Sequence, residues 1–135
     1  MSLQPELLFN LHLDVETPAA AVCPTDVGER KLFIVRGGTF EGPKLKGTVL
    51  PGCVDWGLAG SDGLFRLDVR AVLQTDDGAL IAVTYRGIRD IPADYWRTTP
   101  EFSTTSEPYR WLTRLVAVGV GTKVPTGVDY QVYRV

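Results

Sequence analysis

LFRLDVRAVLQTDDGALIAVTYRG, residues 64–87, is the stretch that decides the fold class. Two runs rich in apolar and β-branched residues flank the dipeptide Asp77-Gly78. A type I′ turn needs positive φ at both central positions, and Asp-Gly is one of the pairs that adopt it. The stretch therefore predicts a β-hairpin with a two-residue loop, in which Arg70 lies opposite Tyr85.

This register divides the hairpin into two faces. One face carries mainly apolar and small residues: Leu67, Val69, Ala71, Leu73, Leu80, Ala82 and Thr84. The other mixes polar and apolar residues: Asp68, Arg70, Val72, Gln74, Ile81, Val83 and Tyr85. Neither face is purely polar, which is typical of a wall covered on both sides. The sequence leaves open which face is inside, although polar groups among apolar ones are typical of a ligand cavity.

Segments on either side of the hairpin are also strand-like. Residues 7–15 alternate with a period of two, and His12 falls on their polar face. Residues 31–36, 109–120 and 128–135 are further apolar runs, while Pro92–Tyr95 predicts one short helical turn. About eight strands with little helix predict an all-β fold, either a single small antiparallel β-barrel or a strongly bent sandwich. The predicted domain spans residues 1–135.

Composition excludes several classes of function. The 135 residues suffice for one domain with a real core, and 44% hydrophobic with 22% charged residues is ordinary for a globular protein. A net charge of -2 with scattered Lys and Arg argues against nucleic-acid or anionic-membrane partners. The segment MSLQPELLF lacks the features of a signal peptide, and the expected location is cytoplasmic.

Few residues of this chain suit a metal or a redox site. His12 is the only histidine, which excludes most zinc sites. Cys23 and Cys53 form no CxxC motif, and we expect two reduced thiols, although their spacing alone allows a disulfide. The sequence therefore predicts neither a metal nor a cofactor.

The stretch GGTFEGPKLKGTVLPGCVDW, residues 37–56, ends abruptly on Asp55 and Trp56. Its glycines and prolines predict sharp corners at the rim of the barrel, which present both side chains at the mouth. A carboxylate beside an indole can have a raised pKa and act as general acid or base. Asp55 is the predicted catalytic residue and Trp56 a predicted ligand contact. The structural alternative is an aspartate that caps a turn beside a tryptophan that plugs the barrel.

Other polar and aromatic residues are candidate ligand contacts. Asp68 and Arg70 share one strand face, and Tyr85 is predicted to lie opposite Arg70. The guanidinium fork suits a carboxylate or an enolate. The alternative is an ion pair or a solvated outer face. Three further candidates come from aromatic segments, with structural or core roles as their alternatives: Arg97, Tyr109 and Trp111.

Several segments in a fixed order resemble a known family. They are GGTFEGP (37–43), DW (55–56), LDVRAVLQTDDGALI (67–81), YWRTTPEF (95–102), YRWL (109–112) and VYRV (132–135). From about residue 6 to its end, the chain resembles the family of unknown function DUF3237, also called UPF0311. The resemblance implies a single-domain β-barrel of lipocalin-like outline, with no general activity established.

Three positions depart from the pattern of that family. Cys53-Val54 precedes the Asp-Trp pair where Gly-Ala is usual, and Ala71 stands where an aromatic residue is common. Ser103 occupies a position where the family often has a glutamate. If that glutamate is an acid or base in relatives, this chain lacks it.

Three functional hypotheses follow. The first is a small-molecule-binding barrel that acts as a cofactor-independent enzyme of the isomerase, cyclase or lyase type on a small, partly apolar, anionic ligand. In it, Asp55 transfers a proton and Arg70 stabilises an oxyanion. The second is a non-catalytic carrier or sensor of the same ligand. The third is an oligomeric interaction module, and apolar outer residues are compatible with a homodimer. The sequence alone does not decide whether the protein is an enzyme.

Overall fold

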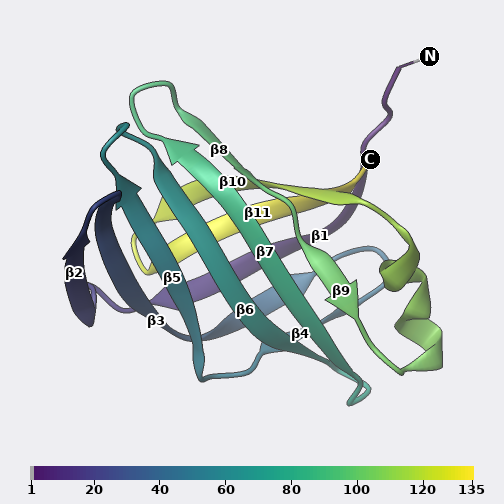
Figure 1. Cartoon of the computed structure of the whole chain (residues 1–135). Helices are drawn as coiled ribbons and strands as arrows, with labels where there is room; N and C mark the ends of the chain where they lie inside the picture. The colour runs from purple at the N-terminus through teal and green to yellow at the C-terminus, as the bar shows by residue number, and fades with distance from the viewer. Residues whose placement is uncertain (1) are drawn as a thin grey trace.

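A computed structural model describes residues 2–135, so that Met1 of the predicted domain lies outside the described residues. It consists of strands and one 3-10 helix (Figure 1). The elements are β1 (Glu6–Val15), β2 (Ala21–Thr25), β3 (Gly28–Glu41), β4 (Lys46–Val49), β5 (Cys53–Gly60), β6 (Phe65–Thr75), β7 (Leu80–Asp90), β8 (Tyr95–Thr98), β9 (Glu101–Ser103), η1 (Glu107–Arg114), β10 (Ala117–Val124) and β11 (Gly127–Arg134). In the part of the chain that the structure describes, no helix is long and apolar enough to cross a membrane.

Eight of the strands close into an antiparallel barrel in the order β1-β3-β5-β6-β7-β8-β10-β11 (Figure 1). The pairing of β6 with β7 completes the ring. The remaining strands are short additions: β2 and β4 pair with β3, β4 also pairs with β6, and β9 pairs with β7. The predicted all-β barrel is confirmed.

The β6–β7 hairpin has a different register from the predicted one. Val69 pairs with Tyr85, and Arg70 pairs with Thr84. The loop is one residue longer than predicted, because the Thr75 amide donates to the Ala79 carbonyl at 2.9 Å and the Thr75 hydroxyl accepts from the Ala79 amide at 2.9 Å. Of the two residues predicted to have positive φ, only Gly78 does, at 89°. This is the three-residue loop that ends in a left-handed glycine.

The corrected register changes which side chains are inside. A shift of one residue moves a strand's side chains to the opposite face of the sheet relative to its partner. Tyr85 is therefore buried on the same face as Leu67 and Val69, whereas Arg70 is exposed outside. The predicted grouping of Arg70 with Tyr85 is wrong.

Two further local expectations are also wrong. Residues 109–114, expected to begin a strand, belong to η1, because Pro108 near its start suits a helix and cannot donate to a sheet. The Trp111 indole nitrogen also donates to the Pro108 carbonyl at 3.0 Å, which stabilises this turn. Residues 92–94 form the turn between β7 and β8 instead of a helix, and Asp94 there has a φ of 51°.

Aromatic side chains fill the half of the barrel that η1 covers. Phe9 is 1% exposed and makes edge-to-face contacts with Phe40 and Phe102, with ring centroids 5.6 and 5.9 Å apart. Leu112 of η1 belongs to the same buried cluster. This end of the interior is thus densely packed.

Replacing the central ring of that cluster tests the packing. Phe9→Ala is expected to lower the free energy of unfolding by about 3–5 kcal/mol, because it removes buried apolar area and leaves a cavity. Urea unfolding followed by circular dichroism measures the loss. Val22→Ala, at a site 51% exposed in β2, is the control and should change stability by less than about 0.5 kcal/mol. A loss below about 1 kcal/mol for Phe9→Ala would contradict dense packing here.

Candidate functional site

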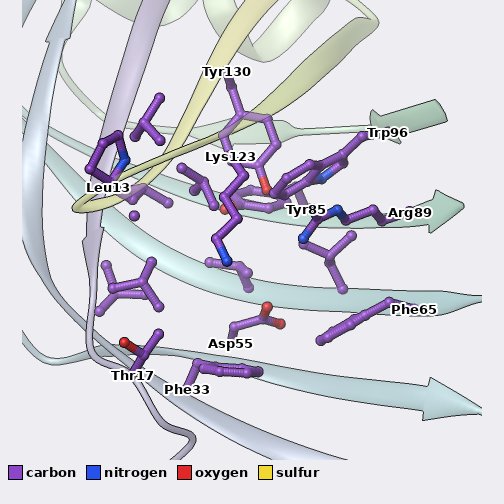
Figure 2. A pocket seen from close by; sticks show the side chains of 18 residues that line it. Leu13, Thr17, Phe33, Asp55, Phe65, Tyr85, Arg89, Trp96, Lys123 and Tyr130 are labelled. Carbon is purple, nitrogen blue, oxygen red and sulfur yellow. The ribbon is translucent and has the colours of Figure 1, made fainter. Parts of the chain in front are cut away.

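The other half of the barrel, toward the C-terminal end of β1, encloses a cavity of about 250 Å³ (Figure 2). Its walls are largely apolar and come from strands around the barrel: Leu13, Val15, Phe33, Val35, Phe65, Leu67, Val69 and Val128. Thr17 and Pro125 lie at its rim, on the segment after β1 and on the turn between β10 and β11. A concave apolar cavity with a few polar groups is typical of a small-molecule site.

Asp55 points its carboxylate into this cavity from β5 (Figure 2). Side chains of a strand alternate between faces, so Cys53, Asp55 and Gly57 turn inward together. A Cβ at Gly57 would overlap the Phe65 ring, and glycine thus lets this ring lie against β5. Phe33 and Phe65, whose centroids are 6.2 Å apart, flank the carboxylate in Figure 2.

One backbone amide binds the Asp55 carboxylate. Its Oδ1 accepts from the Asp68 N–H at 3.1 Å. The β5–β6 ladder pairs Asp55 with Val69 and next pairs Leu58 with Arg66. The ladder is thus interrupted between these two pairs, and the Asp68 amide in this interruption donates to the Asp55 carboxylate. This hydrogen bond fixes the position of the Asp55 side chain on the wall of the cavity.

Burial in the cavity changes the acidity of Asp55. The pKa of Asp55 is raised from 3.8 to about 6, and desolvation is the main cause. The hydrogen bond from the Asp68 amide lowers this pKa, and the negative charge of Asp68 raises it by a smaller amount. A buried carboxyl group with few compensating partners favours the protonated form. Its pKa is consequently close to the range in which a group can both accept and donate a proton at neutral pH.

Three aromatic residues with polar atoms form the wall beside Asp55. Tyr130 packs edge-to-face on Tyr85 and Trp96, with centroids 5.3 and 5.6 Å away. The Tyr130 hydroxyl and the Trp96 indole nitrogen are buried without a hydrogen-bond partner within residues 2–135. Burial is the main cause that raises the pKa of both tyrosines, which therefore remain protonated at neutral pH. Buried unpaired donors are rare in proteins, and these two line a cavity.

Two cations also line the cavity (Figure 2). The Arg89 guanidinium carbon lies 4.3 Å from the centroid of the Trp96 ring, which fixes the orientation of both groups. Lys123 reaches inward from β10 with its ammonium group (Figure 2). Trp96 lies against Gly121, where a Cβ would overlap the indole.

Of the residues predicted from the sequence, Asp55 and Tyr85 line the cavity. Trp56, next to Asp55, faces outward because strand neighbours alternate; it is 48% exposed and stacks under Arg30. Asp68 and Arg70 are on the outer face, where an Asp68 oxygen lies 3.8 Å from the Arg86 guanidinium. The expected group of Asp68, Arg70 and Tyr85 is not assembled.

The three aromatic-segment candidates lie outside the cavity lining as well. Arg97 stacks on Tyr95 at 4.7 Å and donates to the Trp96 carbonyl at 3.0 Å. Tyr109 and Trp111 are on η1 at the other end of the barrel, where the Tyr109 hydroxyl donates to Asp77 Oδ1 at 3.0 Å. Tyr109 and Trp111 lie there because the helix η1 replaces the predicted strand.

The lining residues that sequence reasoning missed include four that carry the cations and the aromatic donors of the wall: Trp96, Arg89, Lys123 and Tyr130. Tyr130 could have been found, because it alternates in step with Val128 and Val132 of the last strand. No local pattern marks Arg89 or Lys123, which lie near strand ends. Ser103, where the family often has a glutamate, is exposed on β9, so this departure leaves the charge of the cavity unchanged.

The structure adds little for metals or thiols. Within residues 2–135, no group of three or more His, Cys, Asp or Glu side chains is placed to hold a metal ion. Cys23 is exposed and Cys53 buried, and both are free.

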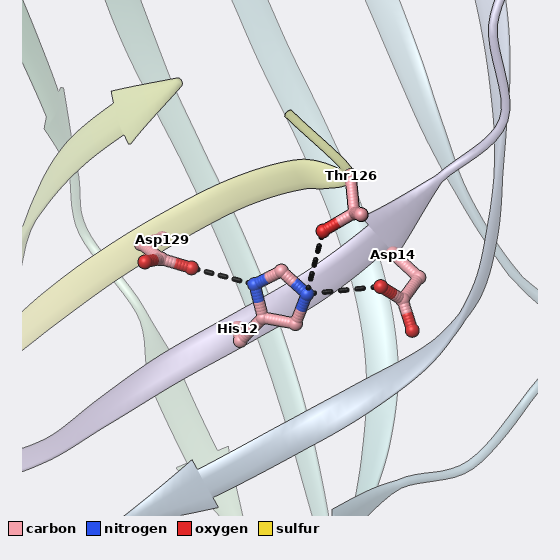
Figure 3. A network of polar contacts seen from close by, with 4 residues as sticks. All are labelled: His12, Asp14, Thr126 and Asp129. Carbon is pink, nitrogen blue, oxygen red and sulfur yellow. Dashed lines mark hydrogen bonds and ion pairs between the residues drawn. The ribbon is translucent and has the colours of Figure 1, made fainter. Parts of the chain in front are cut away.

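His12 occupies a polar cluster on the outside of the barrel (Figure 3). Its Nδ1 lies 2.6 Å from Asp129 Oδ1, and its Nε2 lies 2.9 Å from Asp14 Oδ1 and 3.3 Å from Thr126 Oγ1. Hydrogen bonding to Asp129 is the main cause that raises the pKa of His12 above 6.5; burial opposes it, and the bond to Asp14 adds to it. The His12 side chain thus links β1 to β11 and to the turn before it.

This cluster predicts a pH-dependent contribution to stability. Because the pKa of His12 is higher in the folded state, its contribution is fully present below pH 6.5 and is lost as the pH rises through the folded-state pKa. His12→Gln is expected to destabilise the protein more at pH 5.5 than at pH 9, measured by urea unfolding. Asn10→Gln, exposed on the same strand, is the control. An equal loss for His12→Gln at both pH values would contradict the ion-pair interpretation.

Comparison with known proteins relates this barrel to others. It is similar to the structure of a beta-barrel like protein from Acinetobacter baumannii AYE, with a TM-score of 0.90, 33% identity and coverage of 97% of this chain and 94% of that one. The UPF0311 protein CA_C3321 of Clostridium acetobutylicum is 30% identical over an alignment of 146 positions, gaps included. The alignment covers 96% of this chain and 92% of that protein.

A fungal relative carries a functional name. The hydroalkoxylation enzyme phnH of Penicillium herquei is 34% identical over 114 residues, which cover 84% of this chain and 71% of that protein. The model of the family described as "Protein of unknown function (DUF3237)" matches residues 3–135. The resemblance found in the sequence is thus confirmed, and the chain belongs to the DUF3237 family.

Proposed function

We propose that this protein is an acid–base catalyst that moves a proton on a small, largely apolar molecule bearing an oxygen. The Asp55 carboxylate is the base. The observation that carries this proposal is a carboxyl group with a pKa of about 6 in an apolar cavity that it shares with two unpaired buried donors. Perturbed pKa values in a cavity are typical of functional sites.

The chemistry follows from the charges that such a reaction creates. At pH 7 the carboxylate form of Asp55 outnumbers the acid form by about ten to one, so the group can remove a proton from a carbon next to a carbonyl. The C–H electron pair becomes the enolate double bond, and the carbonyl π pair moves to oxygen. The Tyr130 hydroxyl and the Trp96 N–H are the donors for that oxygen. The proton on Asp55 then returns to the same or another carbon.

This assignment replaces Arg70 as the stabilising group. Arg70 is exposed on the outer face of the barrel, away from the cavity lining. Preorganised donors in a site that excludes water stabilise developing charge more strongly than solvated ones. Tyr130 and Trp96 meet that condition because both are buried against the cavity.

The name of the fungal relative supports the same reaction class. Hydroalkoxylation adds the oxygen and the hydrogen of an O–H group across a carbon–carbon double bond: the O–H bond and the C=C π bond break, and one C–O and one C–H bond form. A single residue that accepts a proton and later donates one meets this need, as Asp55 would. The 34% identity with that enzyme therefore favours catalysis over the carrier hypothesis.

Deuterium exchange tests the catalytic proposal without knowledge of the natural substrate. The protein is expected to accelerate deuterium incorporation into β-tetralone, a small enolisable aromatic ketone, in D₂O, as followed by proton NMR. Asp55→Asn should lower the enzymatic rate by at least about 10²-fold, and Tyr130→Phe by roughly 10²-fold. Arg70→Gln is the matched control and should stay within about twofold, because this side chain lies outside the cavity.

The outcomes separate the hypotheses. Binding of β-tetralone without exchange above the buffer rate would support a carrier. An Arg70→Gln variant as slow as Asp55→Asn would contradict the assignment of the cavity as the site.

The pH profile tests the role of Asp55 as a base. The exchange rate is expected to rise tenfold per pH unit below about pH 6 and to level off above it, since only the carboxylate removes a proton. Rates from pH 4.5 to 8, corrected for the buffer reaction, measure the profile, and circular dichroism at each pH controls for unfolding. A rate that falls above pH 6 would indicate that Asp55 acts as a general acid.

A further inference from the structure

We infer that the ligand of the Asp55 cavity is a small aromatic or alicyclic carboxylate, whose anionic group binds to Lys123 and Arg89. This inference rests on the proposed function in taking that cavity as the ligand site. It transfers the recognition of an anion, expected from the sequence at Arg70, to two other cations.

The first argument is the balance of charge in the cavity. Its lining contains two basic side chains, Arg89 and Lys123, and one carboxyl group, Asp55. Among residues 2–135, neither cation has an ion-pair partner within 4.0 Å. Two unpaired cations at an apolar cavity are best compensated by an anionic ligand.

The second argument is that the base does not neutralise the cations. Within the residues that the structure describes, no ion pair within 4.0 Å joins Asp55 to Arg89 or Lys123. A ligand carboxylate can therefore bind at the cations without displacing Asp55, and the reacting carbon of the ligand can lie at Asp55.

The third argument is the geometry of the two cations. Arg89 is held by its stacking on Trp96 at 4.3 Å, so its planar fork of donors is oriented before a ligand arrives. Lys123 is exposed on β10 and directs a compact charge into the cavity (Figure 2). A fork and a point charge on one cavity suit the two oxygens of a carboxylate.

The fourth argument concerns the rest of the ligand. Phe33 and Phe65 flank Asp55 and supply flat apolar surface on which a ring can pack (Figure 2). Trp96 and Tyr130 line the same cavity and carry the buried unpaired donors proposed above for an oxygen at the reacting end. The ligand thus combines an acidic group, an apolar ring and an enolisable or hydroxylated position.

A pair of isosteric probes tests the class of ligand. The affinities of 2-naphthoate and of neutral 2-naphthamide are measured by isothermal titration calorimetry at pH 7.5. We expect the wild type to bind the carboxylate roughly ten- to a hundredfold more tightly than the amide. Lys123→Met and Arg89→Gln should each reduce this preference by about tenfold, and the double variant should abolish it.

Two controls keep the result specific. Lys44→Met removes an equal charge beside Trp111 at the other end of the barrel and should leave the preference unchanged. Lys123 is exposed, so that its replacement tests recognition even if Arg89→Gln disturbs the packing of Trp96. Equal affinity of the wild type for both probes, no binding of 2-naphthoate, or a preference in Lys123→Met as large as in the wild type would overturn the inference.

The same titrations with Asp55→Asn separate this inference from the proposed function. That variant lacks the base but keeps both cations, and its preference for the carboxylate should persist. A persistent preference in a protein that never exchanges β-tetralone would leave the ligand class standing and would remove the catalytic role.

Discussion

The pairing of β6 with β7 closes the barrel, and its register determines which side chains the interior receives. The register depends on the turn, where Thr75 bonds to both backbone groups of Ala79 and Gly78 adopts a left-handed conformation. Since strand faces alternate, a slip of one residue would place Tyr85 outside. The aromatic wall of the cavity would then lose one of its three members.

The closed ring leaves an interior that two kinds of side chain share. Phe9, Phe40 and Phe102 fill one half, and η1 covers it with Leu112. The other half remains a cavity, lined by branched aliphatic residues and by rings that stand against glycines. A desolvated carboxyl group and two unpaired donors destabilise the hollow half. The apolar packing of the other half stabilises the fold and offsets this destabilisation.

Those costly groups occur together. Asp55, Tyr130 and Trp96 lie on three different strands and line one cavity, and none has its full complement of hydrogen bonds within the barrel. Buried polar groups that lack hydrogen-bond partners are typical of sites whose partners come from a bound ligand or a transition state. The proposed proton transfer in this chain rests on that arrangement.

The sequence by itself determined the all-β fold class and singled out Asp55 as a candidate site residue, because both follow from residue periodicity and type. The tertiary structure alone decided the rest. Hairpin register depends on one extra loop residue, Asp76, which a local turn pattern did not reveal. The presence of Arg89 and Lys123 at one cavity is non-local, since residues 34 positions apart share a cavity only when strands from different parts of the chain surround it.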